Sequence, residues 1–211
     1  MGHAGTMNET LDAVVLAGGA ARRMGGADKP GLSVAGRTLL ERVTDAVRAH
    51  NAGTRDGGRV IVVGPPRESP RALYVREDPP GSGPVPALRA GLPHVRTPRF
   101  ALLAADLPHL EPGHLAVLLA AADQDADGAG AVFADSTGRE QWLTGVWRTG
   151  AVRAALADYR GRSLYGLLGP LTPRAVALAD DLAVADCDTP DDLDRARRIL
   201  EPPTGWGPQA G

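Results

Sequence analysis

Lysine is almost absent from this chain, because 22 of its 23 basic residues are arginines and Lys29 is the only lysine. A compact ammonium and a planar guanidinium are not interchangeable at a crowded phosphate site. Lys29 ends a glycine-rich segment that directly follows a short apolar run at residues 13–17. This placement favours a phosphate-binding role for Lys29, with chance retention of one lysine as the alternative.

Cysteine and long apolar runs are also scarce. Cys187 is the only cysteine, which excludes an internal disulfide and fits a reducing, cytoplasmic compartment. No apolar run approaches the roughly 18 residues of a membrane helix, and the N-terminus has no signal-peptide core, so no membrane contact is expected. The 23 basic and 25 acidic residues nearly balance, so nucleic acid is not an expected partner.

Several familiar catalytic motifs are missing. The glycine loop lacks the Gly-Lys-Ser/Thr of a Walker A motif and the glycine spacing of a dinucleotide fingerprint. No Gly-x-Ser-x-Gly elbow occurs, and the five histidines are too scattered for a zinc site. Cys187 has no partner cysteine, and it is expected to be a packing residue, as are Trp142 and Trp147.

Apolar strand-like runs alternate with helical patterns along most of the chain. Strands are expected at 13–17, 59–64, 72–76, 100–104, 132–134, 142–148 and 174–179. Helices are expected at 39–50, 84–95, 112–122, 150–159, 163–168 and 190–200. This alternation predicts an α/β fold with a mainly parallel, helix-covered sheet. The length suits a single domain at residues 11–201, with loose tails at 1–10 and 202–211.

Ligands of such sheets collect beyond the carboxyl ends of the strands. Lys29 follows the first strand, Asp78 the third and Asp106 the fourth, while Asp188 precedes the last helix. Together with the loop amides, these side chains are expected to line one rim and to suit Mg²⁺ and phosphate. Each aspartate alone could equally be a turn former or a helix cap.

The glycine loop resembles the opening signature of nucleotidyltransferases of the molybdenum cofactor guanylyltransferase (MobA-like) family. The matching residues are Leu16-Ala17-Gly18-Gly19, Arg23-Met24-Gly25 and Lys29. Later landmarks of the family follow in order: Glu77-Asp78, Gly83-Pro84, Ala105-Asp106-Leu107-Pro108, Gly161-Arg162-Ser163-Leu164 and Thr189-Pro190-Asp191-Asp192-Leu193. The similarity spans roughly residues 12–200.

The resemblance implies a three-layer α/β/α, Rossmann-like fold of the nucleotide-diphospho-sugar transferase type. It implies Mg²⁺, GTP as nucleotide, a molybdopterin-type acceptor, and transient contact with molybdenum cofactor biosynthesis proteins or molybdoenzymes. By the same resemblance, the backbone of residues 16–19 holds the guanine, Arg23 and Lys29 grip the phosphates, Asp78 contacts the nucleoside and Asp106 ligates Mg²⁺. Asp188 stands where the family has an asparagine and could be a second ligand.

Substrate identity is less tightly indicated than reaction type. Gly18-Gly19 favours guanine, because cytidylyl-transferring relatives usually have Leu-Ala-Ala-Gly. Arg160, Arg162 and Ser163 could bind a phosphate of the acceptor at a helix start, or Ser163 could simply cap the helix while the arginines face solvent. Departures at Val63, Ala87 and Asp188 leave two alternatives open. They are transfer of CMP or another nucleotide to a different phosphorylated acceptor, and an accessory protein that binds nucleotide without turnover.

Overall fold

A computed structural model describes residues 9–18, 28–54, 56–125 and 128–201. The expected tails at 1–10 and 202–211 therefore lie almost wholly outside the described residues. Within the described ranges, no helix is both long enough and apolar enough to cross a membrane.

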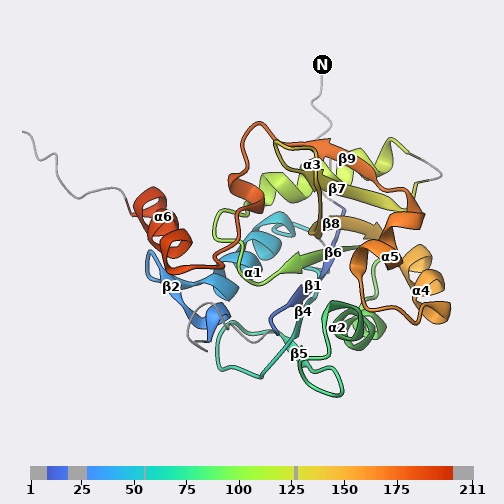
Figure 1. Cartoon of the computed structure of the whole chain (residues 1–211), viewed down its shortest axis with the longest axis horizontal. Helices are drawn as coiled ribbons and strands as arrows, with labels where there is room; N and C mark the ends of the chain where they lie inside the picture. The colour runs from blue at the N-terminus through green and yellow to red at the C-terminus, as the bar shows by residue number, and fades with distance from the viewer. Residues whose placement is uncertain (1–8, 19–27, 55, 126–127, 202–211) are drawn as a thin grey trace, which may run out of the picture.

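A seven-stranded sheet forms the centre of the molecule (Figure 1). Its strand order is β5 (Leu73–Val75), β4 (Val60–Val63), β1 (Asp12–Leu16), β6 (Arg99–Ala104), β8 (Glu140–Arg148), β7 (Gly130–Ala134) and β9 (Arg174–Ala177). Among the described strands of this seven-stranded sheet, β8 alone runs antiparallel to its neighbours, β6 and β7. The remaining pairs are parallel, which confirms the mainly parallel sheet.

Helices cover both faces of this sheet. Ala13 and Val15 face α1 (Leu39–His50) and α3 (Pro112–Asp123), whereas Val14 and Leu16 face α2 (Pro84–Gly91), α4 (Thr149–Asp158) and α5 (Leu164–Leu168). All five residues of β1 are buried, as expected for a strand with helices on both sides. The three-layer α/β/α arrangement is thus confirmed. The helix expected at 84–95 ends earlier, at Gly91, and a 3₁₀ turn with Pro93 follows.

A smaller apolar cluster lies beside the sheet. In it, α6 (Pro190–Leu200) packs against the hairpin β2–β3 (Ser33–Val34 and Arg37–Thr38) and against Cys187. Two-residue strands carry no readable periodicity, so this hairpin was not predicted. Cys187 is 1% exposed, and burial with the nearby Asp106 charge raises the pKa of its thiol to about 11. The thiol therefore stays protonated, which fits the expected packing role.

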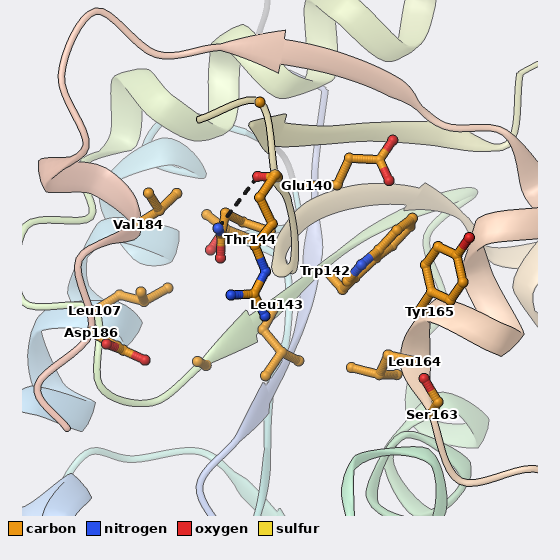
Figure 2. A pocket seen from close by; sticks show the side chains of 14 residues that line it. Leu107, Glu140, Trp142, Leu143, Thr144, Ser163, Leu164, Tyr165, Val184 and Asp186 are labelled. Atoms are coloured by element: carbon orange, nitrogen blue, oxygen red, sulfur yellow. Dashed lines mark hydrogen bonds between the residues drawn. The ribbon is translucent and has the colours of Figure 1, made fainter. Parts of the chain in front are cut away.

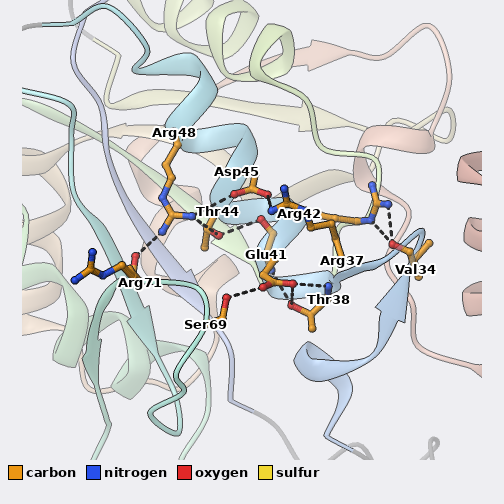
Figure 3. A network of polar contacts seen from close by, with 10 residues as sticks. All are labelled: Val34, Arg37, Thr38, Glu41, Arg42, Thr44, Asp45, Arg48, Ser69 and Arg71. Carbon is orange, nitrogen blue, oxygen red and sulfur yellow. Dashed lines mark hydrogen bonds and ion pairs between the residues drawn. The ribbon is translucent and has the colours of Figure 1, made fainter.

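A polar network fixes the start of α1 (Figure 3). Thr38 Oγ1 accepts a hydrogen bond from the Glu41 amide at 3.1 Å, and Glu41 Oε2 accepts one from the Thr38 amide at 2.8 Å. The Ser69 hydroxyl donates to Glu41 Oε1 at 2.5 Å. These donors, Ser69 foremost, lower the pKa of the Glu41 carboxyl. The reciprocal bonds between Thr38 and Glu41 cap α1, and the Ser69 hydrogen bond ties this cap to the loop that follows β4.

The Glu41→Ala substitution is expected to lower the free energy of unfolding by about 1 kcal/mol, the usual effect of losing a helix cap. Asp45→Ala on the same helix is the matched control. The Asp45 side chain is 41% exposed and forms surface ion pairs with Arg37 and Arg48, which contribute little to stability. Urea unfolding of both variants provides the measurement, and equal losses would contradict a specific role for the cap.

Candidate active site

Lys29 lies at the centre of a charged cluster. It begins a short 3₁₀ turn, and its ammonium forms ion pairs with Asp106 and with Asp188, the latter at 2.6 Å. Burial lowers the pKa of the ammonium, but the two carboxylates outweigh burial and the pKa is raised above its ordinary value. Lys29 therefore carries its charge throughout the physiological pH range.

The chain around Lys29 is held from both sides. The carboxylate of Asp28 forms a two-pronged ion pair with the Arg67 guanidinium in the loop after β4. This contact lowers the pKa of Asp28. On the other side, the Leu32 amide donates to the Lys29 carbonyl at 3.1 Å. These contacts orient the Lys29 side chain toward the carboxyl end of β6.

Three carboxylates gather beside Lys29, and two of them, those of Asp106 and Asp188, contact its ammonium. Asp106, Asp186 and Asp188 each offer an oxygen, and these oxygens lie within 4.8 Å of one another. The Cys187 amide donates to the Asp106 carbonyl at 3.2 Å, which holds the second loop against the end of β6. Desolvation raises the pKa of the Asp186 carboxyl, and the negative charges of Asp188 and Asp106 add to this effect. The cluster is thus a candidate site for a divalent cation.

Asp186 was not predicted from the sequence. The available signal was the alternation Asp186-Cys187-Asp188, in which a buried residue separates two carboxylates. In an extended segment, such alternation places the two outer side chains on the same side.

One cavity opens beside this cluster, at the carboxyl ends of β1 and β6. This inner cavity has a volume of about 320 Å³. Its lining residues are Leu16, Gly18, Glu77, Gly81, Gly83, Pro84, Ala87, Ala104, Asp106 and Leu143. Among these described lining residues, Glu77 and Asp106 are the ionisable ones, so this part of the cavity wall is mostly apolar with two carboxyl groups.

A second, outer cavity of about 660 Å³ adjoins it (Figure 2). Residues 138–144, residues 163–165 and Asp186 contribute to its lining. Because β8 runs antiparallel, its first residues lie at the sheet edge where the parallel strands end. Ala104 and Leu143 line both cavities, while Asp106 lines the inner one and Asp186 the outer one. The charged cluster therefore lies where the two cavities meet.

Residues 13–175, more than half of the chain, match the domain family described as MobA-like NTP transferase. The chain belongs to this family. It is a nucleotidyltransferase, and its sheet and helices are those of the MobA-like NTP transferase fold.

Individual relatives agree with this assignment. A probable molybdenum cofactor guanylyltransferase of Natronomonas pharaonis is 30% identical over 204 residues, which cover 89% of this chain and 96% of the relative. The structure of molybdopterin-guanine dinucleotide biosynthesis protein A from Archaeoglobus fulgidus superimposes with a TM-score of 0.68 at 19% identity, over 90% of this chain and 98% of that one. A 2-C-methyl-D-erythritol 4-phosphate cytidylyltransferase from Thermus thermophilus gives a TM-score of 0.64 at 19% identity, over 91% of this chain and 99% of that one. These two structural similarities show the fold alone.

The structure brings part of the expected MobA-like site together. Lys29, Asp106 and Asp188 meet at one point, and Leu16 and Gly18 line the inner cavity. The Ala17 side chain packs into the core, and the contact expected of its backbone stays a prediction. Gly19 and Arg23 lie outside the described residues, so their contacts stay predictions.

Asp78 is exposed and does not contribute to the lining of the inner cavity, whereas its neighbour Glu77 is buried there. The nucleoside contact expected for Asp78 stays a prediction. Glu77 was missed, because the sequence does not show which of the two neighbouring carboxylates after β5 the fold buries.

Of the residues expected to contact the acceptor, Ser163 alone appears in the lining of the outer cavity. Its hydroxyl also caps α5 by accepting from the Gly166 amide at 3.4 Å. Arg160 is exposed and donates to the Ala157 carbonyl at 2.8 Å, and Arg162 is exposed.

The two tryptophans have different roles. Trp147 is fully buried, as expected of a packing residue. Trp142 stacks on Trp147 with ring centroids 6.2 Å apart, but it also lines the outer cavity. Tyr165, 68% exposed, meets Trp142 edge-on at 5.8 Å (Figure 2). The outer cavity therefore has an aromatic wall.

Proposed function

We propose that this protein transfers GMP from GTP to a molybdopterin-type acceptor and releases pyrophosphate. One observation carries the proposal: Lys29 and the three carboxylates lie at the junction of two adjoining cavities. A group transfer between two bound molecules needs such an arrangement, because the reacting atoms must meet beside the groups that neutralise their charge.

The nucleotide is assigned to the inner cavity and the acceptor to the outer one. The inner cavity begins at Leu16 and Gly18, where the glycine loop leaves β1. The outer cavity is larger, and the aromatic wall of Trp142 and Tyr165 suits a planar fused-ring acceptor. The names of the relatives, which are molybdenum cofactor guanylyltransferases, support GTP and molybdopterin as substrates.

The residues present fit a magnesium ion. Three carboxylates and one ammonium have a formal net charge of −3 + 1 = −2 when ionised, which a divalent cation would balance. Their oxygens span up to 4.8 Å, close to the roughly 4 Å between opposite ligands of octahedral Mg²⁺. Asp106 and Asp188, with Asp186 as a third donor, would hold the ion. When bound, it would neutralise and orient phosphate oxygens.

The chain's own residues contribute positioning and charge. Near neutral pH a terminal phosphate of the acceptor is already ionised, so its attack on the α-phosphorus requires no general base. The Lys29 ammonium would neutralise charge on the transferred or leaving phosphates, and Arg23 would hold the β- and γ-phosphates. We also propose that residues 11–201 act as one domain and that the protein works in the cytoplasm, as expected from its single cysteine.

Pyrophosphate release from each nucleoside triphosphate, measured with Mg²⁺ in the presence and absence of molybdopterin, tests the function. The expected result is release that requires both GTP and molybdopterin and that stops when the metal is chelated. A preference for CTP would show that the nucleotide is CTP rather than GTP. Release that requires another phosphorylated compound in place of molybdopterin would show that this compound is the acceptor. Tight nucleotide binding without any release would contradict turnover and indicate an accessory protein.

A further inference from the structure

One buried carboxyl oxygen in the inner cavity has no hydrogen-bond partner. Glu77 is 6% exposed, and its Oε1 accepts a hydrogen bond from the Gly81 amide at 2.8 Å. Its Oε2 is buried and unpaired within the part of the chain that the structure describes. Burying a polar oxygen without a donor is costly, so such an atom calls for a partner that these described residues do not supply.

The surroundings of Glu77 narrow the choice of partner. The other carboxyl group among the described lining residues, that of Asp106, is already paired with Lys29. Gly18 lies directly beside Glu77, since a Cβ atom at position 18 would be 3.4 Å from Glu77 Oε1. The absence of a side chain at Gly18 keeps the approach to the carboxyl group open. A ligand that enters the cavity at the glycine loop can therefore supply the donor that the described residues do not provide.

We propose that Glu77 selects the nucleobase by accepting hydrogen bonds from the N1–H and the 2-amino group of guanine. This inference rests on the proposed function, and it names the residue that would distinguish GTP from other nucleotides. A carboxylate only accepts hydrogen bonds. Guanine presents two adjacent donors on its Watson–Crick edge, whereas adenine N1 and cytosine N3 present lone pairs that would oppose the carboxylate. Oε2 is free for one donor, and Oε1 retains a second lone pair beside its bond to Gly81.

The Glu77→Gln substitution inverts this pattern at almost constant volume. The Gly81 amide keeps the oxygen of the new side chain in the place of Oε1, which puts an NH₂ donor in the place of Oε2. In the variant, this NH₂ group faces the N–H donors of guanine. With cytosine or adenine it faces the lone pair of N3 or N1 instead. GTP affinity is expected to fall about 10- to 100-fold, the usual range for losing a hydrogen bond to a charged group. CTP and ATP affinities are expected to hold or rise, so the GTP/CTP affinity ratio falls further.

Calorimetric titration with Mg²⁺ and GTP, CTP or ATP measures these ratios for the whole protein. Glu68→Gln is the matched control, because Glu68 is exposed and lies outside the inner cavity. Its GTP affinity and GTP/CTP ratio are expected to equal those of the wild type. Asp78→Asn tests the neighbouring carboxylate. The inference would be overturned if Asp78→Asn lost the preference for GTP while Glu77→Gln kept it in full.

A second binding experiment uses only the wild-type protein, so it stays informative even if Glu77→Gln folds poorly. Inosine triphosphate lacks the 2-amino group, and 1-methylguanosine triphosphate lacks the N1 proton. Each is expected to bind wild-type protein at least about 10-fold more weakly than GTP. Equal binding of all three would overturn the role of Glu77. A wild-type preference for CTP would instead overturn the choice of GTP, so failure of the inference and failure of the proposed function give different results.

Discussion

Replacing Lys29 with alanine is expected to reduce turnover by about 10²- to 10³-fold, the usual effect of losing one preorganised charge contact in an active site. Lys29 is the only lysine of the chain, is 14% exposed, and contacts carboxylates from two distant loops. Its removal leaves three neighbouring carboxylates without their cation and takes away a charge that would face the phosphates. The rate of pyrophosphate release at saturating nucleotide and acceptor provides the measurement.

Two further variants make this test specific. Lys29→Arg is expected to restore little activity, because a planar guanidinium does not fit the compact space between Asp106 and Asp188 that the ammonium occupies. Arg174→Ala removes an exposed cation on β9, away from both cavities, and it is expected to leave turnover unchanged. Wild-type turnover in folded Lys29→Ala protein would refute the assignment of the site.

Replacing Asp106 with alanine is expected to reduce turnover at least as strongly and to raise the Mg²⁺ concentration that half-maximal activity requires. Asp106 borders the inner cavity, contacts Lys29 and belongs to the carboxylate cluster, so one substitution removes a metal ligand and disturbs the ammonium. Its side chain is 17% exposed, against 46% for Asp188. Because a buried charge is screened less, the loss should be larger for Asp106→Asn than for Asp188→Asn.

Initial rates measured over a range of MgCl₂ concentrations separate the metal requirement from the maximal rate. Asp158→Asn, at the exposed end of α4, is the control and should match the wild type in both quantities. Thermal unfolding shows whether the variants remain folded. An unchanged Mg²⁺ requirement and an unchanged rate in Asp106→Ala would exclude Asp106 from the metal site.

Local sequence patterns were sufficient for most helices and strands. The apolar spacing at residues 39–50 predicted α1 with its observed bounds, and the apolar run at 100–104 predicted β6, which begins one residue earlier. These patterns are readable because burial of one helix face or of a central strand depends mainly on residues a few positions apart. The order of charged residues after successive strands also predicted that Lys29, Asp78, Asp106 and Asp188 would line one rim. Lys29, Asp106 and Asp188 do meet there, whereas Asp78 does not line the inner cavity.

The sequence by itself thus determined the α/β class, the family and the three charges at one rim of the sheet. The tertiary structure decided which further groups join them. The reversal of β8 brings residues 138–144 to the rim, the fold buries Glu77 rather than Asp78, and Asp186 completes the carboxylate cluster. Lys29 and Asp188 are 159 positions apart, and their contact depends on how α6, the β2–β3 hairpin and the end of β6 pack together. Local periodicity carries no information on such contacts, because their geometry is fixed by the packing of segments that are distant in the chain.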